Sequence, residues 1–339
     1  METAIGKLLS HPYWKSLFPE YRRLLHLSAP LPTGLNPYTE EGVVIQLALA
    51  HGEMRSIKEV VARNIILGKI RSGELYPGAT AIDATSGNTG RAYAGILQPL
   101  GINLRLIVQG TLPAGKLGQL RIYGEGVELV PHFGPESTVQ RARREAEESG
   151  GKLVLLDQYS CEANPQAHEQ YTAPELLGLT GGVVDAIVTP LGTCGTAIGF
   201  SRFFKKWGKK TNREIKIVGV ACDHNQKVPQ IPGMRTIPEI DRDVRLQWRD
   251  DVDQIRLVLR EHAVRGSRRL AYAEQSWPGL STGAAYIGAI EHIGENLEWF
   301  RDKRVIIISP DSIEPYMDIM NAEQDDASVA RALSARPEF

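Results

Sequence analysis

The stretch that decides the fold of this chain is Thr85-Ser86-Gly87-Asn88-Thr89-Gly90. It follows the apolar segment Thr80–Ala84 and precedes Arg91–Leu100, which has helical character, so we expect a strand, a glycine turn and a helix start. The glycines allow a tight bend, while hydroxyl groups, the Asn88 amide and free N–H groups at the helix start face one small volume. Such a turn suits an anionic ligand, although polar glycine turns more often carry no ligand at all.

The composition is that of an ordinary globular protein. The chain has 339 residues and 37.4 kDa, enough for two domains, with 42% hydrophobic and 23% charged residues. These values exclude a disordered or fibrous class. The net charge of -1 argues against a nucleic-acid-binding surface, which needs clustered excess Lys and Arg.

The cysteines and the apolar runs bear on location and partners. Cys161, Cys194 and Cys222 are far apart and lack metal-ligand spacing, which predicts no metal site and a reduced, cytoplasmic compartment. The N-terminus lacks the apolar core of a signal peptide, and no run approaches eighteen apolar residues. We therefore expect no membrane partner.

Strand and helix patterns alternate along most of the chain, which predicts an α/β fold with mainly parallel sheets. Residues Met1–Leu27 predict two short helices packed on a larger body. The least regular region is Lys227–Arg269. Strands are expected at Val43–Leu49, Thr80–Ala84, Leu104–Val108, Val127–Val130, Leu153–Leu156, Val183–Val188, Ile215–Ala221 and Val305–Ser309, and helices at Pro113–Tyr123 and Glu136–Ser149.

A further helix is predicted to begin at Ser56. Ser56 and Glu59 have the spacing of a capping box, which places Lys58 in the first helical turn. A cation there opposes the helix dipole at a cost of about 0.3–1 kcal/mol. Lys58 is therefore either a surface lysine or an amine nucleophile whose pKa the same field lowers.

Three more loops either follow a predicted strand or lie at the start of a predicted helix. Gly192-Thr193-Cys194-Gly195-Thr196 presents consecutive N–H groups and two hydroxyls, which suits a phosphate. It lacks the lysine of an ATP-binding loop and the spacing of a dinucleotide fingerprint. The others are Gly279–Gly283 and Pro310-Asp311-Ser312. Together the loops match a ligand site at the strand ends of an open sheet.

Six motifs occur in the order and approximate spacing of the cysteine synthase and cystathionine β-synthase family, which the chain resembles over about residues 30–320. They are Ser56-Ile57-Lys58, Thr85–Gly90, Gln158 with Asn164-Pro165-Gln166-Ala167-His168, Gly192–Thr196, Gly279–Ala285 and Pro310-Asp311-Ser312. The resemblance implies a fold-type II, tryptophan synthase β-like architecture of two open, mainly parallel twisted sheets flanked by helices. It also implies a homodimer and pyridoxal 5'-phosphate as cofactor. The expected domains are residues 55–155, small and mobile, and 156–339, large, with residues 1–54 packed on the large domain.

The resemblance also implies roles for individual residues. Lys58 is similar to the lysine that forms the internal Schiff base, Asn88 to the partner of the cofactor's phenolic oxygen, and Ser281 to the hydroxyl facing the pyridine nitrogen. The phosphate cradle is expected at Gly192, Thr193, Cys194, Gly195 and Thr196. The groups expected around the substrate carboxylate are Thr85, Ser86, Gly87, Thr89 and Gln158.

The implied reaction is β-replacement on an activated serine-like amino acid, of the O-acetylserine or O-phosphoserine type, by a small nucleophile through aminoacrylate. The displaced Lys58 amine would remove the α-proton, and a serine rather than a carboxylate at the pyridine nitrogen favours expulsion of a β-leaving group. β-Elimination or dehydration to a keto acid is an alternative, and a catalytically idle binding subunit is another.

Departures from the family pattern concern the pocket wall and indicate a specialised member. Gly110–Gly115 replaces the Glu-Thr-Met-Ser segment of cysteine synthases, and Ile231–Arg235 replaces a Gly-Ile-Gly-Ala-Gly run. Arg235 is expected either to meet an anionic group or to lie in solvent.

Overall fold

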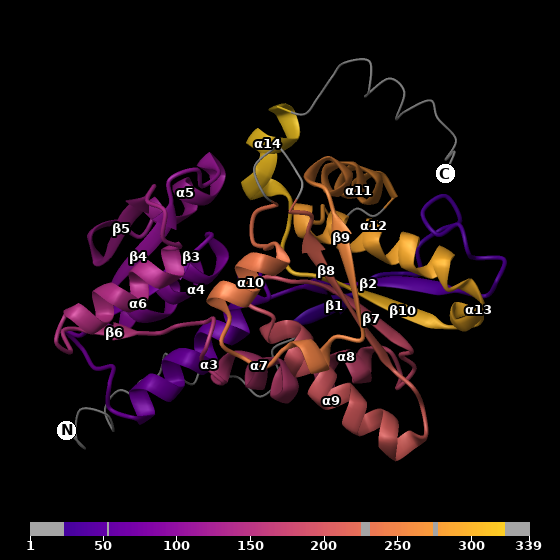
Figure 1. Cartoon of the computed structure of the whole chain (residues 1–339), viewed down its shortest axis with the longest axis horizontal. Helices are drawn as coiled ribbons and strands as arrows, with labels where there is room; N and C mark the ends of the chain where they lie inside the picture. The colour runs from indigo at the N-terminus through magenta and orange to yellow at the C-terminus, as the bar shows by residue number, and fades with distance from the viewer. Residues whose placement is uncertain (1–23, 53, 225–230, 274–276, 323–339) are drawn as a thin grey trace.

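The computed structural model describes residues 24–52, 54–224, 231–273 and 277–322. It contains two sheets, one of six strands in the order β1-β2-β10-β7-β8-β9 and one of four in the order β5-β4-β3-β6. All pairs are parallel except β1 with β2. The prediction of two mainly parallel sheets flanked by helices is therefore confirmed, and Figure 1 shows the smaller sheet beside the larger one.

The strands are β1 (Leu25–Leu27), β2 (Val44–Ala50), β3 (Thr80–Thr85), β4 (Asn103–Gln109), β5 (Val127–His132), β6 (Leu153–Leu155), β7 (Ala186–Pro190), β8 (Lys216–Cys222), β9 (Gln254–Val258) and β10 (Arg304–Ser309). The helices are α3 (Lys58–Arg71), α4 (Asn88–Leu97), α5 (Ala114–Arg121), α6 (Thr138–Glu148), α7 (Ala163–Ala167), α8 (Ala173–Leu179), α9 (Gly195–Thr211), α10 (Ile237–Asp243), α11 (Arg260–Ala273), α12 (Leu280–Glu295), α13 (Leu297–Phe300) and α14 (Met317–Ala322). Single turns lie at η1 (Gln98–Leu100), η2 (Gly124–Gly126), η3 (His168–Thr172), η4 (Arg249–Asp251) and η5 (Glu314–Tyr316).

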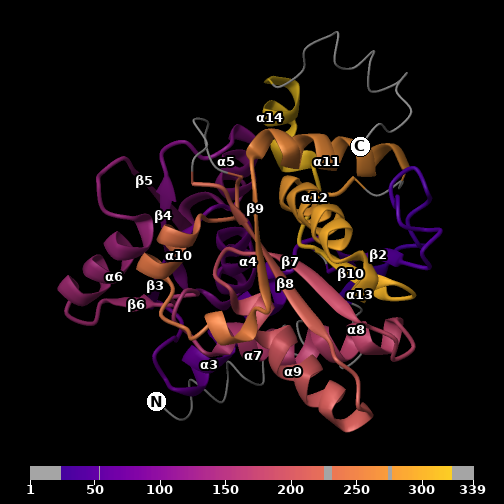
Figure 2. The ribbon, with the colours of Figure 1, turned by 45° about the vertical axis from the view of Figure 1, so that its right-hand side comes forward.

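Both faces of the larger sheet are buried, which explains the continuous apolar run in β10. Side chains alternate across a strand, so Val305 and Ile307 pack with α11 and α12, while Ile306 and Ile308 pack with α8 and α9. Figure 2 shows the two helix layers on opposite faces of this sheet. Parallel strands covered on both faces need this composition.

Residues of α3 and α4 form one hydrophobic cluster with residues of the smaller sheet, among them Val61, Ile65, Tyr93 and Leu104. This shared core supports our proposal that residues 55–155 form the smaller domain. No helix in the described ranges has both the length and the apolar character needed to cross a bilayer.

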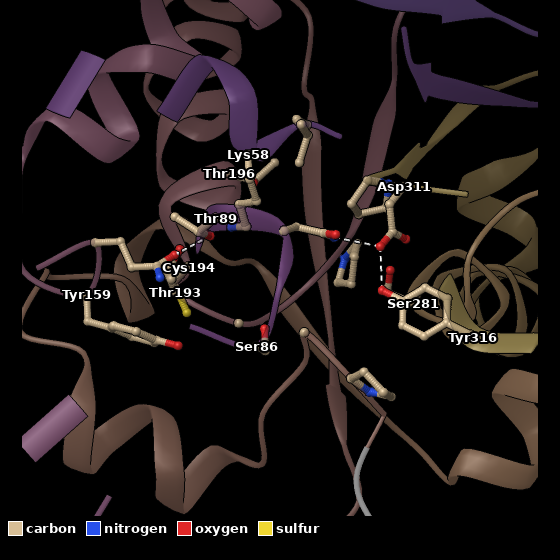
Figure 3. A pocket seen from close by; sticks show the side chains of 18 residues that line it. Lys58, Ser86, Thr89, Tyr159, Thr193, Cys194, Thr196, Ser281, Asp311 and Tyr316 are labelled. Atoms are coloured by element: carbon tan, nitrogen blue, oxygen red, sulfur yellow. Dashed lines mark hydrogen bonds between the residues drawn. The ribbon is translucent and has the colours of Figure 1, made fainter. Parts of the chain in front are cut away.

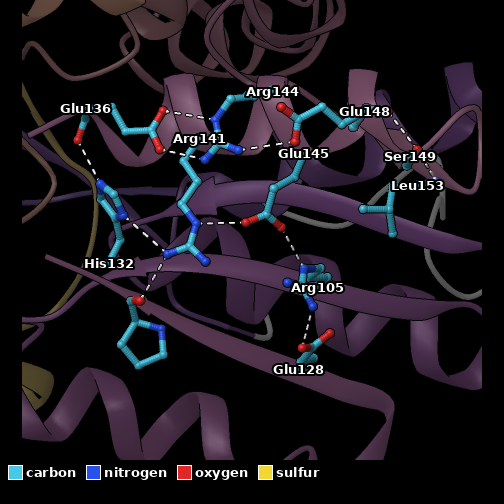
Figure 4. A network of polar contacts seen from close by, with 12 residues as sticks. Arg105, Glu128, His132, Glu136, Arg141, Arg144, Glu145, Glu148, Ser149 and Leu153 are labelled. Atoms are coloured by element: carbon cyan, nitrogen blue, oxygen red, sulfur yellow. Dashed lines mark hydrogen bonds and ion pairs between the residues drawn. The ribbon is translucent and has the colours of Figure 1, made fainter. Parts of the chain in front are cut away.

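The charged helix α6 covers the smaller sheet through ion pairs as well as packing. Arg105 of β4 pairs with Glu145 of α6 and Glu128 of β5, and Arg141 also pairs with Glu145 (Figure 4). Such partly exposed pairs contribute only about 0–1 kcal/mol each. The buried face at Val139, with the capping box that opens α6, therefore does more to place the helix.

The helices expected within Met1–Leu27 were only partly testable, because residues 1–23 lie outside the described ranges. The prediction was wrong for Leu25–Leu27, which forms strand β1 and pairs antiparallel with β2. Leu25 is fully buried there, so tertiary packing overrides the helical spacing. The irregular region Lys227–Arg269 also contains a strand, β9, paired with β8.

Candidate active site

A pocket lies at the carboxyl ends of strands β3, β7 and β10, where loops from both sheets meet (Figure 3). This is where open parallel sheets bind ligands. Of the predicted site residues, the pocket brings together Lys58, Ser86, Asn88, Thr89, Gln158, Gly192, Thr193, Cys194, Thr196 and Ser281. Thr85 instead lines a neighbouring cavity. Gly87 and Gly195 do not line the pocket, but their neighbours on either side in the chain do.

Lys58 is the first residue of α3 and lines the pocket. Removal of its ammonium group from water lowers its pKa to about 8, against the opposing effect of Cys194 and Asp311. Burial is thus the largest cause of this shift. A lysine with this pKa is partly neutral near pH 8 and can act as a nucleophile or base.

The capping box predicted at Ser56 and Glu59 was wrong. Helix α3 has Ile57 at its cap with no side-chain hydrogen bond. Glu59 is buried, pairs with Arg63 one turn later and accepts a hydrogen bond from the Met54 amide. A buried carboxylate needs a cation more than a cap, and Arg63 supplies it.

The pKa of Lys58 predicts how cofactor loading depends on pH. A lysine pKa lowered from 10.5 to about 8 means that the neutral amine becomes the major form above pH 8. With pyridoxal phosphate, the cofactor that the family resemblance implies, visible absorbance after its addition to the apoprotein should therefore appear at a rate that rises through about pH 8 and then levels off. Stopped-flow absorbance between pH 6.5 and 10 measures this rate. A rate still rising tenfold per pH unit above pH 9 would contradict the assignment.

The Thr85–Gly90 turn is held from within. The Thr85 hydroxyl accepts hydrogen bonds from the Gly87 and Gly90 amides at 3.0 and 2.9 Å. Gly87 has φ +125°, a conformation that side chains rarely adopt, and an added Cβ would approach the Lys116 side chain to 2.7 Å. Thr85 and Gly87 therefore shape the turn, which leaves Ser86 and the first amides of α4 to face the pocket.

Thr89 and Gln158 form one unit in the pocket wall. The Thr89 hydroxyl donates to Gln158 Oε1 at 2.8 Å, and Gln158 Nε2 donates to the Ala84 carbonyl at 2.8 Å. Both side chains are nearly fully buried. Their position beside the N-terminus of α4 favours a carboxylate, because helix N-termini carry unpaired amides and positive partial charge.

The Gly192–Thr196 loop opens α9, a helix of 17 residues. A side chain at Gly192 would place its Cβ 2.5 Å from the Gly233 carbonyl oxygen, and one at Gly195 would collide with Asn164. Cys194 has φ +62°, a left-handed conformation that usually favours glycine. Burial raises the pKa of its thiol to about 12. Cys194 is therefore a neutral wall residue whose backbone still follows the glycine conformation.

Two buried residues support this loop, and both belong to a sequence motif that by itself implied no role for them. Asn164 Nδ2 donates to the Gln158 carbonyl at 2.7 Å and to Thr193 Oγ1 at 2.9 Å. His168 Nε2 lies 3.2 Å from Thr196 Oγ1. Burial, and then the charge of Lys58, lowers the pKa of His168 to about 3, so its ring is neutral. The sequence signal for both residues was the motif Asn164-Pro165-Gln166-Ala167-His168.

Three other residues at the site received no role from the sequence, although Asp311 belongs to one of the six motifs. Asp311 and Tyr316 line the pocket beside Asn88, and the Lys116 side chain lies behind them, 1% exposed. A lysine buried to this degree cannot be recognised from a single sequence, because lysines are nearly always exposed.

A second cavity of about 620 Å³ adjoins the pocket. The two share Ser86, Tyr159, Pro232 and Gly233 as walls. Arg235 lines the second cavity, but its guanidinium pairs with buried Asp243 at 2.6 Å and donates to the Tyr159 hydroxyl at 3.0 Å. Arg235 thus does not lie in open solvent, and its guanidinium is already paired and not available to bind an anion. It holds Tyr159 in the wall that the two cavities share.

The sequence pattern of the pyridoxal-phosphate dependent enzyme family matches residues 33–311. The chain belongs to this family of pyridoxal-phosphate-dependent enzymes. It is 31% identical over 277 residues to cysteine synthase A of Escherichia coli K12, covering 77% of this chain and 83% of that protein.

Solved structures of this family are similar along nearly the whole chain. The cysteine synthase of Entamoeba histolytica superimposes with a TM-score of 0.75 at 25% identity, over 93% of this chain and 94% of that one. An O-ureido-L-serine synthase superimposes with a TM-score of 0.72 at 25% identity, over 90% and 96%.

The pocket residues fit the cofactor of a pyridoxal-phosphate-dependent enzyme. The residues that would hold it are a partly neutral lysine at Lys58, a glycine loop at the N-terminus of α9 for the phosphate, and neutral polar groups at Asn88 and Ser281 for the ring. The loop has no space for side chains at Gly192 and Gly195, as a phosphate cradle requires.

Proposed function

We propose that this enzyme catalyses β-replacement on an activated serine-like amino acid, of the O-acetylserine or O-phosphoserine type. The observation that carries the proposal is that Lys58 lines one pocket together with the starts of α4 and α9, two helix N-termini of the kind that suits an anion. The first fits an amino-acid carboxylate and the second a cofactor phosphate. The similarity to cysteine synthase A supports the same reaction class.

In this proposal Lys58 holds the cofactor, the Gly192–Thr196 loop binds its phosphate, and Asn88 and Ser281 contact its ring. Bound pyridoxal phosphate withdraws electrons from the α-carbon of an attached amino acid and so acidifies its proton. The Lys58 amine, with its pKa lowered to about 8, takes that proton near neutral pH. Ser86, Thr89 and Gln158 hold the substrate carboxylate.

We propose that the nucleophile enters through the adjoining cavity of about 620 Å³ and is larger than sulfide. That volume lies in the range of small-molecule sites, about 300–1,000 Å³. The polar groups of Ser86 and Tyr159 face both spaces, so a bound nucleophile there would adjoin the carbon that loses its leaving group.

A substrate panel tests the proposal. Purified enzyme with bound cofactor is incubated with O-acetylserine, O-phosphoserine, serine or threonine, each with sulfide, cysteine, homocysteine or an α-amino acid bearing a free amine. Mass spectrometry then identifies the products. A new amino acid supports β-replacement, whereas a keto acid formed equally without nucleophile supports the elimination alternative. Absence of both products with all combinations supports an idle binding subunit.

Thr89→Val should weaken amino-acid binding and leave the cofactor in place. The change removes the hydroxyl that orients Gln158, and a lost buried hydrogen bond of this kind raises KM about tenfold. The reciprocal variant Thr196→Val should instead raise the concentration of pyridoxal phosphate needed for half-saturation. KM and cofactor titrations of both variants separate the two sites. Cofactor loss in Thr89→Val with unchanged KM would reverse the assignment.

The homodimer implied by the family resemblance stays a prediction. Size-exclusion chromatography with light scattering should give the mass of two chains of 37.4 kDa each, and the mass of a single chain would contradict the prediction.

A further inference from the structure

A buried polar cluster joins the two sheets beside the pocket. It consists of Asn88 at the start of α4, Lys116 of α5, Asp311 after β10 and Tyr316 of η5. Figure 3 shows Asp311 and Tyr316 side by side in the pocket wall. The sequence motifs assign a role only to Asn88, so the other three side chains need an explanation.

Both ends of the Asn88 amide are held by this cluster. Lys116 Nζ donates to Asn88 Oδ1, while Asn88 Nδ2 donates to Asp311 Oδ2 at 2.6 Å. An amide nitrogen carries two hydrogens, and the second N–H of Asn88 is directed at the Tyr316 hydroxyl in the pocket wall, where a ligand oxygen can replace that hydroxyl as acceptor. An ammonium can only donate, so its contact fixes which end of the amide is oxygen.

The cluster is held tightly around the Lys116 ammonium. Its Nζ lies 3.2 Å from Asp311 Oδ2 and 4.5 Å from the centre of the Tyr316 ring. Tyr316 also donates its hydroxyl hydrogen to Asp311. Burial lowers the pKa of Lys116, and the Asp311 carboxylate opposes that shift. The carboxylate is thus paired within the pocket wall, opposite neutral Ser281.

The backbone leaves room for this lysine. An added Cβ at Gly87 would lie 2.7 Å from Lys116 Cδ, so the left-handed glycine of the turn lets the lysine stem pass. An added Cβ at Gly115 would lie 2.6 Å from the Pro315 carbonyl oxygen, so α5 packs closely against η5. Two glycine positions therefore accommodate the same cluster.

We infer that Lys116 is a positioning residue that fixes the amide of Asn88 with an N–H toward the phenolic oxygen of the cofactor. The inference rests on the proposed role of Asn88, and it does not require the proposed reaction. A hydrogen bond to that oxygen stabilises its ionised form, which absorbs at longer wavelength than the protonated form. Lys116 therefore acts on the colour of the bound cofactor through Asn88.

Absorbance spectra of the cofactor-loaded protein test this inference. Lys116→Met should move absorbance from the visible band to the near-ultraviolet band, and the cofactor should dissociate about tenfold faster. Asn88→Ala should shift absorbance in the same direction. The double variant Lys116→Met/Asn88→Ala should match Asn88→Ala alone, because a residue that acts through another adds nothing once that residue is gone. Lys116→Arg should retain the wild-type spectrum.

Lys216→Met is a matched control. The Nζ atom of this lysine also lies over an aromatic ring, 3.8 Å from the centre of the Trp299 ring, but Lys216 belongs to β8 of the larger sheet and not to α5. It should leave the spectrum unchanged. If Lys116→Met does not fold because Asp311 is left unpaired, Lys116→Met/Asp311→Asn removes both charges and should still show the shift. The inference would be overturned if folded Lys116→Met or folded Lys116→Met/Asp311→Asn kept the wild-type spectrum. It would also be overturned if the shifts of the two single changes added in Lys116→Met/Asn88→Ala.

Discussion

Replacing Lys58 with alanine should lower kcat by about 10²–10⁴-fold, the usual contribution of a general base. It should also remove the visible absorbance of the bound cofactor. Both effects have one cause, because the same amine holds the cofactor and takes the α-proton in the proposed reaction. The lowered pKa of about 8 gives that amine a neutral fraction near physiological pH, which an ordinary surface lysine lacks.

The matched control is Lys69→Ala in the same helix. Lys69 pairs with Glu74 at 2.7 Å on the surface, away from the pocket, and its loss should leave both kcat and absorbance unchanged. Turnover measured with the best substrate pair, together with absorbance scans, gives the two results. Visible cofactor absorbance that persists in Lys58→Ala would move the covalent role to another lysine.

Gly195→Ala should weaken pyridoxal phosphate binding by about 10- to 100-fold. The new methyl group would collide with the Asn164 amide, which cannot move without breaking its bonds to the Gln158 carbonyl and Thr193 Oγ1. Two buried hydrogen bonds of about 1 kcal/mol each, with a displaced phosphate loop, account for that loss. Titration of apoprotein with pyridoxal phosphate, followed by absorbance or fluorescence, measures it.

Gly68→Ala in α3 serves as the control, because no heavy atom lies within 4 Å of its added Cβ. In a helix interior this change should stabilise the fold by about 0.5–1 kcal/mol and leave cofactor affinity unchanged. Wild-type affinity in Gly195→Ala would show that the loop at the start of α9 is not the phosphate site.

The predictions that succeeded rest on local patterns. Alternating strands and helices, and glycine loops after strands, are encoded within short windows, so the sequence located β3, α4 and the loop before α9 closely. The failures arose where tertiary contacts opposed a local pattern. Leu25–Leu27 has helical spacing yet pairs with β2, and Glu59 has capping spacing yet pairs with Arg63, because burial in the tertiary structure outweighed both patterns.

Periodicity was enough to predict the α/β class, and the six motifs gave the family resemblance, which in turn implied most of the residues that line the pocket. The groups that hold those residues in place became known from the tertiary structure. Lys116 comes from α5 and Asp311 from the end of β10, 195 positions apart, and their contact follows from two sheets packing together. Arg235 likewise finds Tyr159 and Asp243 only after folding. The supporting contacts are long-range, and no local pattern records them.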